Sequence, residues 1–493
     1  MNTQFAGKSL LYCAVLAFGP CIPIMAQERD IAPPPPGVAA ELDGDYEVLT
    51  RGYLHEAFAT PTTFDPVEQP IIEKQPPELI DEILPDHRPA GENVIWIPGY
   101  WAYEQEQQDF IWISGLWRNV PPGRQWVPGY WHDVSGGFQW VAGTWIRADG
   151  PVSFFPEPPQ SQERGPSSVA PSANHFYVPG CWVYQDNRYG WRPGYWAPYQ
   201  RGWVWVPARY TRAANGYVYS DGYWDYPFDR RGQVFAPVRF RNQAYANVGF
   251  RFAPQAVIDS NVGLMLHLFV RPDRGMYVFG DYYGGGATPW FEYGRSDRGY
   301  DPLFTYYQWH SGPEFVNRIQ GWNKYFDSHP DYRPRPTLTE QLAFTNAHQD
   351  FQYLGQAVLG DTLENLVSTR GNADRFMPLE AGQRESLTGV TNQIRGLTGE
   401  RLRLESAASV DANATTNQSL RLPTEKLNLP ALPGIRVPEV GREVPDIPSN
   451  LRNVAPQAPR VPRGRDLPAP NLPRNLPRNL PRDLPLDLPR LPF

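Results

Sequence analysis

The sequence predicts a mainly β protein. Two blocks of antiparallel β-meander, built from aromatic repeats of about 14 residues, precede a small α+β region and a disordered proline-rich tail. Three observations predict this class. A six-residue pattern, Trp-x-x-Gly-x-Trp, recurs along the chain; aromatic residues make up 14% of the sequence; and it holds 55 prolines and 43 glycines. Short units of this kind bury apolar surface only by packing on their neighbours.

The repeats fall into two blocks, residues 92–150 and 174–255. The first aromatic residues of the motifs in block 1 are 16, 14 and 14 positions apart, and those of block 2 are 14 apart throughout. Regular spacing at this period indicates one structural unit per repeat. The first aromatic residues of the eight motifs are Trp96, Trp112, Trp126, Trp140, Tyr177, Trp191, Trp205 and Tyr219.

Turn residues alternate with short runs of β-forming residues inside each block. Segments such as 110–113 and 138–141 have strand composition. Pro-Gly pairs, as at Pro98-Gly99, are typical of type II turns, in which glycine takes a positive φ. Two interpretations remain open: each Pro-Gly reverses the chain, or it forms a bulge that bends a longer strand. In either case the glycine can bring the two flanking tryptophans to one face.

The N-terminal 26 residues resemble an export signal, with Lys8 before an apolar stretch and Ala26 at a cleavage position. An uncleaved signal anchor is the alternative. Residues 27–91 and 151–173 are rich in proline and are predicted to be linkers. Two of the three cysteines lie in the signal, so the mature chain keeps only Cys181 and has no internal disulfide.

After the repeats, residues 256–335 are predicted to form a hairpin, with strands at 265–270 and 276–279, and an amphipathic helix that begins near Pro313. Residues 336–405 are predicted to be helical, opening with a capping box at Thr337. Residues 406–493 form the predicted low-complexity tail. From position 421 onward it holds 17 prolines, and 12 Lys/Arg face seven Asp/Glu, which makes it basic.

Charge and motifs exclude several classes of function. The formal net charge of −7 predicts no nucleic-acid partner. No catalytic, cofactor-binding or metal-binding residues are predicted: the eight histidines are scattered, and the zinc-protease pattern that starts at His55-Glu56 fails at Ala59. Cys181 has one basic neighbour in sequence, Arg188, so no reactive thiol is expected. No membrane span is predicted once the signal is removed.

The tryptophans are the only candidate binding residues. Exposed rings make flat platforms for sugars, but the favoured interpretation is that the rings pack on one another and stabilise the sheet. Arginines near the rings, namely Arg118, Arg124, Arg192 and Arg209, are expected to stack on them. The candidate platform comprises Trp96, Trp101, Trp112, Trp117, Trp126, Trp131, Trp140, Trp145, Trp191 and Trp196.

The motifs Trp96–Trp101 and Trp126–Trp131 resemble those of the bacterial YXWGXW/WXXGXW repeat-containing proteins. Over about residues 45–290, which include the stretch Arg51–Phe58, the chain is similar to exported planctomycete members. This resemblance implies an exported, repeat-built protein with no assigned reaction, and the family offers no catalytic residues to carry over.

The expected function is therefore that of a non-enzymatic structural or interaction module of the cell envelope. It would lie in the periplasm, on the cell surface or outside the cell, with an envelope polymer or protein as its partner. Carbohydrate binding through exposed rings is the alternative. A hydrolase is a weaker third class because no acid/base pair stands out.

Overall fold

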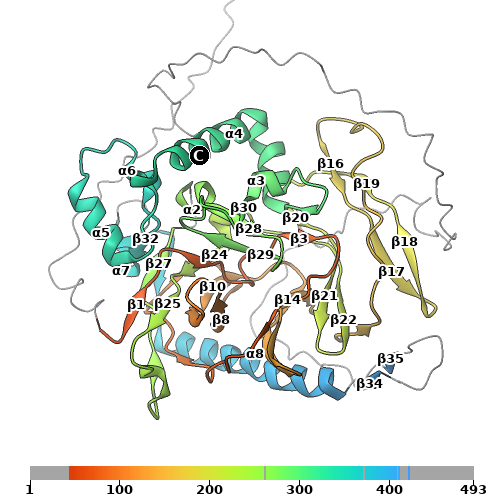
Figure 1. Cartoon of the computed structure of the whole chain (residues 1–493), viewed down its shortest axis with the longest axis horizontal. Coiled ribbons are helices and arrows are strands. Elements are labelled where there is room, and N and C mark those ends of the chain that lie inside the picture. Colours follow the sequence, from red (N-terminus) through yellow and green to blue (C-terminus); the bar gives the residue numbers. More distant parts are fainter. Residues whose placement is uncertain are drawn as a thin grey trace, which may run out of the picture. The chain divides into compact units, whose positions relative to one another are not determined.

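A computed structural model describes residues 44–259, 262–369, 372, 374–407, 409–410 and 420–421 (Figure 1). All of these residues lie in Ala32–Asp466, which is one of the two compact parts of the chain. The predictions of a signal peptide at 1–26 and of a linker over 27–43 lie outside the described residues, as does most of the predicted tail.

Two successive motifs fold together into one four-stranded unit. In unit 1, β7 (Val94–Ile97) pairs with β10 (Leu116–Asn119), and β8 (Tyr100–Glu104) pairs with β9 (Asp109–Ile113). The same pairing recurs three times. Unit 2 consists of β11 (Arg124–Val127), β12 (Tyr130–Val134), β13 (Gly137–Val141) and β14 (Thr144–Arg147). Unit 3 consists of β16 (His175–Val178), β17 (Cys181–Gln185), β18 (Arg188–Arg192) and β19 (Tyr195–Pro198). Unit 4 consists of β20 (Val204–Val206), β21 (Arg209–Ala213), β22 (Gly216–Ser220) and β23 (Tyr223–Asp225).

The register shows what the glycines do. Trp96 lies opposite Trp117, and Trp101 lies opposite Trp112, so both strands of unit 1 continue past their glycines without reversing. Each unit is thus a single long hairpin with a break halfway along. The chain-reversal interpretation of Pro-Gly is wrong. The expected positive φ is wrong as well at Gly99, whose φ lies outside the left-handed region.

The segments predicted to be linkers pack against the repeats where they are described. Phe58, Ile80 and Leu84 of the first segment are buried, as is Phe154 of the second. Proline keeps them out of regular structure but leaves them extended, so they add short edge strands to other elements. These strands are β1 (Tyr46–Val48), β2 (Gly52–Tyr53), β3 (Thr62–Thr63), β4 (Ile71–Ile72), β5 (Asp81–Glu82), β6 (His87–Pro89) and β15 (Phe154–Phe155).

Strands that follow unit 4 extend the sheets of unit 1. β24 (Gly232–Phe235) pairs with β10 and with β27 (Ala256–Ile258), which pairs with β32 (Gly360–Thr362). β25 (Val238–Phe240) lies between β9 and β1. Other short strands are β26 (Arg251–Phe252), β30 (Thr288–Pro289), β31 (Gly299–Tyr300), β33 (Phe376–Pro378), β34 (Ser409–Val410) and β35 (Leu420–Arg421).

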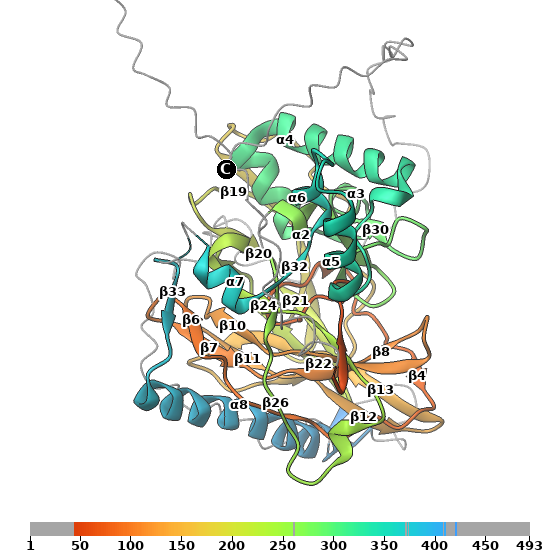
Figure 2. The same ribbon diagram turned by 90° about the vertical axis from the view of Figure 1, so that its left-hand side faces the viewer.

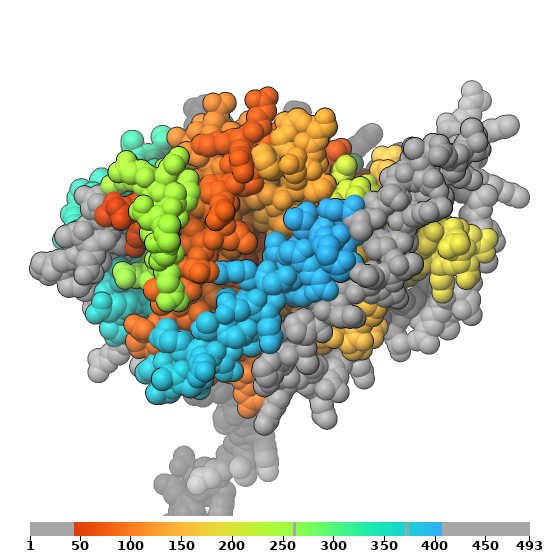
Figure 3. Space-filling view, turned by 90° about the horizontal axis from the view of Figure 1, so that it is seen from below, coloured from red at the N-terminus to blue at the C-terminus, as the bar shows by residue number. Residues whose placement is uncertain are grey.

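The helices lie on two sides of the strands (Figure 2). α4 (Pro302–Ser328) and α5 (Leu338–Ala347) lie on one side, and α8 (Ala381–Ala407) lies on the other. Figure 3 shows α8 crossing the surface of the chain that carries the first repeats. The other α-helices of the described residues are short: α2 (Val262–Leu266), α3 (Trp290–Tyr293), α6 (Leu354–Ala357) and α7 (Leu363–Ser368).

Several local predictions are confirmed. β28 (Leu268–Arg271) pairs with β29 (Met276–Phe279) as the expected hairpin, although its first strand starts three residues later because 262–266 is helical. α4 bends at Gly312, where φ is 72°, and its second half follows from Pro313 as predicted. Thr337 caps α5 by accepting a hydrogen bond from the Glu340 amide.

Candidate functional site

The centre of unit 1 is a buried carboxylate that the repeat itself does not contain. Glu82 lies in the proline-rich segment before the repeat and is 6% exposed. Its Oε2 accepts hydrogen bonds from Trp96 Nε1 at 3.1 Å and from the Gly99 amide at 3.0 Å. Its Oε1 accepts from Trp112 Nε1 at 2.8 Å and from the Gly115 amide at 2.9 Å. Two motifs related by an approximate twofold thus converge on one side chain.

These contacts explain the first half of the motif. The first tryptophan and the glycine supply two N–H donors aimed at one carboxylate oxygen. The glycine is required by close approach: a Cβ on Gly115 would lie 2.4 Å from Glu82 Oε2 and 2.6 Å from the Trp96 ring. Burial raises the pKa of Glu82, and the hydrogen bonds from the two glycine amides and from the Trp112 indole oppose that rise.

The second tryptophan of each motif holds the backbone of the same segment. Trp101 Nε1 donates to the Glu78 carbonyl at 2.8 Å, and Trp117 Nε1 donates to the His87 carbonyl at 2.9 Å. These two acceptors lie on either side of Glu82 in sequence. Unit 1 is therefore a clamp that holds an extended peptide by one acidic side chain and two carbonyl groups.

Unit 3 repeats this arrangement with the second proline-rich segment. Glu163 is 4% exposed and accepts from the Tyr177 hydroxyl at 3.0 Å and from the Gly180 amide. Trp182 Nε1 donates to the Gln160 carbonyl at 3.1 Å, three residues before Glu163. Glu163 lies 14 residues before Tyr177, and Glu82 lies 14 residues before Trp96, so each block is preceded by its carboxylate at the same offset.

In unit 2 the indole and the glycine amide that bind the buried carboxylate belong to the second motif. Glu56 accepts from Trp140 Nε1 and from the Gly143 amide, both at 2.8 Å, and the Ala57 carbonyl accepts from Trp145 Nε1 at 3.1 Å. Burial raises the pKa of Glu56 to about 7. We call Glu56, Glu82 and Glu163 the anchor carboxylates.

Helix α8 binds unit 2 through a second buried ion. Arg401 is fully buried, and its Nη1 donates to the Pro128 carbonyl at 2.8 Å and to the Ala142 carbonyl at 2.9 Å. Its Nε pairs with Glu405 one turn later in the helix. The two carbonyls belong to the residues just before the two motif glycines of unit 2, so α8 contacts this hairpin at the break halfway along it.

Unit 4 departs from the pattern. Its first motif has Ala208 where the others have glycine. Among the described residues no carboxylate accepts from Trp205, whose Nε1 is buried without a partner. An unpaired buried N–H costs about 1–3 kcal/mol.

The structure places most of the ten candidate platform tryptophans inside the protein. Seven are buried, so their faces are not open to a sugar ring, and the favoured interpretation of packed rings describes them. Trp131, Trp191 and Trp196 are half-buried. The buried seven are Trp96, Trp101, Trp112, Trp117, Trp126, Trp140 and Trp145.

The four arginines divide into two pairs. Arg118 lies over the Trp145 ring and Arg124 over the Tyr223 ring, at 5.3 and 4.8 Å from their centroids. Arg209 instead donates to Thr60 Oγ1. Arg192 donates to the sulfur of Cys181.

Cys181 is the free cysteine of the described chain. Arg192 Nη2 lies 2.8 Å from its sulfur. Burial nevertheless raises the pKa of the Cys181 thiol. A raised pKa lowers the thiolate fraction at neutral pH and does not favour reactivity.

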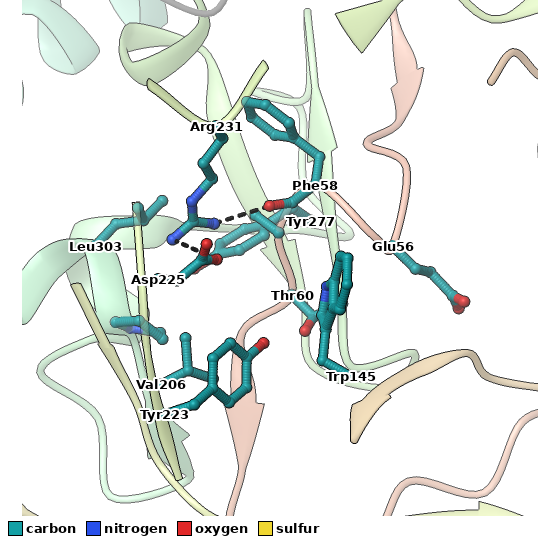
Figure 4. A pocket seen from close by; sticks show the side chains of 12 residues that line it. Glu56, Phe58, Thr60, Trp145, Val206, Tyr223, Asp225, Arg231, Tyr277 and Leu303 are labelled. Atoms are coloured by element: carbon teal, nitrogen blue, oxygen red, sulfur yellow. Dashed lines mark hydrogen bonds and ion pairs between the residues drawn. The ribbon is translucent and has the colours of Figure 1, made fainter. Parts of the chain in front are cut away.

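A closed polar cluster lies where the first chain segment meets units 2 and 4 (Figure 4). Arg118 Nη2 contacts both oxygens of Asp225 at 2.7 Å, and Arg231 Nη2 lies 3.2 Å from Asp225 Oδ2. Arg231 Nη1 donates to the Phe58 carbonyl at 2.9 Å. The cavity that Glu56, Asp225 and Arg231 help to line is about 10 Å³, roughly the room that one water needs. A substrate does not fit there.

A larger hollow of about 490 Å³ lies beside the anchor segment of unit 3. Phe64, Asp65, Arg164 and Arg298 are among its lining residues. It is wide and carries both signs of charge, so its walls do not define one ligand class. In the described part of the chain, no group of three or more His, Cys, Asp or Glu side chains could hold a metal. None of the helices described there has the length and apolar character needed to cross a membrane.

Comparison with protein families agrees with the division into units. The model of the WXXGXW repeat (2 copies) matches four stretches of the chain, and each stretch coincides with one four-stranded unit. No curated protein and no solved structure matches the chain. The matched stretches are residues 91–118, 126–145, 173–197 and 201–225.

The anchor carboxylates are the residues that sequence reasoning missed. They lie in segments whose prolines suggested linkers. The signal that could have found Glu82 and Glu163 is their common offset of 14 residues before the first aromatic residue of each block. Glu56 has no such signal, because it lies 84 residues before the tryptophan that it binds.

Proposed function

We propose that this is an exported, non-enzymatic repeat protein that serves as a structural or interaction module of the bacterial cell envelope. The observation that carries the proposal is the use of the motif's donors. In units 1, 2 and 3 the indole, phenol and glycine donors bind carboxylates of the same chain. The donors that recur from unit to unit are thus directed at building the fold, which supports a scaffold.

The absence of a reaction is part of this proposal. Two buried carboxyls, Glu56 and Asp301, have pKa values raised to about 7, as catalytic acids often have. Both nevertheless have structural partners. Glu56 anchors unit 2, and Asp301 caps α4 by accepting from the Phe304 amide at 2.8 Å. The cavity beside Glu56 is too small for a substrate. These contacts favour a structural role for both groups.

Cell fractionation with N-terminal sequencing tests the export part. We expect the protein outside the cytosol, beginning near Gln27. Intact chain in the cytosol with Met1 retained would contradict export. Co-sedimentation of the purified protein with isolated envelope polymer tests the partner, and a globular protein of similar charge serves as the control.

Carbohydrate binding is the alternative, and the three half-buried tryptophans favour it. Trp131, Trp191 and Trp196 keep part of their rings in solvent. If they bind sugar, envelope glycans should shift the tryptophan emission, and Trp191→Leu should reduce that shift while Trp112→Phe retains it. An unchanged emission across a broad glycan panel would remove this alternative.

A further inference from the structure

Unit 3 holds the proline-rich segment 156–168 through a row of aromatic donors. Two of them donate to backbone carbonyls of the segment, and a third donates to a serine hydroxyl. Grooves lined by aromatic side chains are a recurring means of binding extended proline-rich peptides. The three pairs are Tyr189 with the Pro156 carbonyl, Trp182 with the Gln160 carbonyl and Trp196 with Ser168 Oγ. Unit 3 therefore has the contacts of a peptide-binding groove that the chain's own segment occupies.

The side chain that this groove selects is a carboxylate. Glu163 accepts from the Tyr177 hydroxyl and from the Gly180 amide, and it is buried although Gln162 and Arg164 on either side of it are exposed. The prolines of the segment fix φ near −65°, which favours an extended conformation. The chemistry that fits the groove is thus an extended proline-rich peptide with one acidic side chain.

The anchor segment of unit 1 is locked in place by elements outside that unit. β5, which contains Glu82, pairs with β26, and β6 pairs with β33. From α8, Arg395 donates to the Ile80 carbonyl at 3.0 Å. Release of this segment would break both strand pairings and the contact with the helix, so unit 1 is closed to exchange.

The anchor segment of unit 3 lacks these restraints. Within the described chain no strand lies between β15 and β16, so the segment has no backbone pairing to lose. Its Ser161 amide donates to Asp65 Oδ1 at 2.6 Å. Beside this contact, Gln160 and Arg164 line the hollow of about 490 Å³. The segment is therefore held mainly by the aromatic donors and by its carboxylate.

The exposure of the rings agrees with this difference between the two units. The four aromatic residues at the ends of the two motifs are buried in unit 1 but half-buried in unit 3, so solvent already reaches the groove of unit 3. The buried four are Trp96, Trp101, Trp112 and Trp117, and the half-buried four are Tyr177, Trp182, Trp191 and Trp196.

We propose that unit 3 binds an extended, proline-rich peptide of another protein that carries one acidic residue, in exchange for the chain's own residues 156–168. Such a peptide re-forms the contacts that the own segment gives up, so no buried donor is left unpaired by the exchange. The inference rests on the proposed role as an interaction module and names the class of its partner.

The first test measures binding of a fluorescently labelled synthetic peptide of residues 154–170 to the full chain by anisotropy. In the wild type the own segment competes at an effective concentration of about 1 mM, so the apparent Kd should be of that order. Glu163→Gln in the chain weakens the competitor, and we expect the apparent Kd to fall at least about tenfold, since a charged acceptor is lost. Equal Kd values for the two proteins, or no binding to either, would overturn the proposal.

Glu157 provides the matched control, because it is an exposed acid of the same segment. Glu157→Gln in the chain should leave the Kd within about twofold of the wild type. The same pair of changes is made in the peptide. Against the Glu163→Gln chain, a Glu163→Gln peptide should bind at least about tenfold more weakly than a Glu157→Gln peptide. Equal binding of the two peptides would contradict recognition of the carboxylate.

Trypsin cleavage of the wild-type chain gives a readout that needs no variant of the protein. Arg164 lies in the segment that the peptide displaces, so saturating peptide should raise cleavage after Arg164 at least about fivefold. The peptide carries Arg164→Ala so that trypsin leaves it intact. Cleavage after Arg147, which is exposed outside the segment, should not change. Unchanged cleavage at Arg164 would show that the own segment does not leave the groove.

Sedimentation of the full chain distinguishes another protein from a second copy as the source of the peptide. A dimer that forms as the concentration rises and dissociates when the peptide is added would overturn the assignment to another protein. None of these readouts depends on export or on an envelope polymer. A peptide that fails to bind would remove this partner class and leave the proposed function standing, whereas failed export or co-sedimentation would leave the groove.

Discussion

At Glu82 one side chain satisfies four buried donors, so its charge and both of its oxygens matter. Glu82→Gln keeps the size but replaces one acceptor oxygen by an N–H₂ group that faces the indole and amide of one motif. We expect the free energy of unfolding to fall by about 3 kcal/mol or more, because two hydrogen bonds to a charged group are lost in a buried site. Urea denaturation measures the loss.

Glu78→Gln is the matched control for this substitution. Glu78 is exposed and contributes its backbone carbonyl to Trp101, so the change should stay within about 0.5 kcal/mol. Similar losses for the two variants would show that the carboxylate of Glu82 is not the anchor of unit 1.

Glu56 links the repeat to pH. Its pKa is about 7 in the folded protein, against 4.5 as the ordinary value. Because the folded pKa is raised, this group's contribution to stability is fully present below about pH 4.5 and is lost as the pH rises through 7. We expect the stability difference between the wild type and Glu56→Gln to fall by about 3 kcal/mol between pH 5 and pH 8.

Comparing Glu56→Gln with the wild type at each pH isolates this group. His55 and His267 have pKa values lowered by burial to about 3 and about 4, so acid destabilises the fold through them. Because both proteins retain these histidines, their contributions cancel in the difference. A stability difference that does not change between pH 5 and pH 8 would refute the assignment of a raised pKa to Glu56.

At the scale of elements, α8 depends on one buried arginine. Arg401→Leu removes the donor to the carbonyls of Pro128 and Ala142 and leaves Glu405 buried without its cation. We expect a loss of about 3–5 kcal/mol and faster amide exchange along 381–407. Gln393→Ala, at an exposed site of the same helix, should change neither. Full protection of α8 in Arg401→Leu would contradict this role.

Local chemistry explains which elements were predictable. The hairpin at 268–279, the cap at Thr337 and the strands that flank each motif follow from residues close together in the chain. A bend in a longer strand at Gly99 was one of the two interpretations that the sequence left open, but the sequence did not indicate its cause. The glycine is needed because an opposing ring and Glu82 occupy the place of a Cβ, and both come from distant residues.

The dependence on contacts between distant residues also explains which parts of the candidate site the sequence predicted. Sequence spacing found the tryptophans and favoured their packing, and the rings of units 1 and 2 are mostly buried. It missed Glu82 because a proline-rich segment has no period of its own. Such a segment becomes ordered only when a partner surface satisfies its backbone, and here the second tryptophans do so at Glu78 and His87.

At the scale of the whole molecule, the residues before the repeats belong to the fold. Residues 44–91 supply two anchor carboxylates and the buried Phe58, Ile80 and Leu84. A chain that begins at residue 92 would keep every repeat but leave the donors of units 1 and 2 unpaired. We expect it to lose near-UV circular dichroism and to aggregate, since many buried polar groups would lack partners.

A chain that begins at residue 44 is the control, and it should keep the near-UV spectrum of the full protein. Adding a peptide of residues 44–91 to the shorter chain should restore part of that spectrum if the clamp binds the segment in trans. Because the segment is held by side-chain and carbonyl contacts at several units, Glu82→Gln in the added peptide should weaken that rescue more than Glu78→Gln. If the chain that begins at residue 92 folds, the repeat units do not need the anchor carboxylates of residues 44–91 in order to fold.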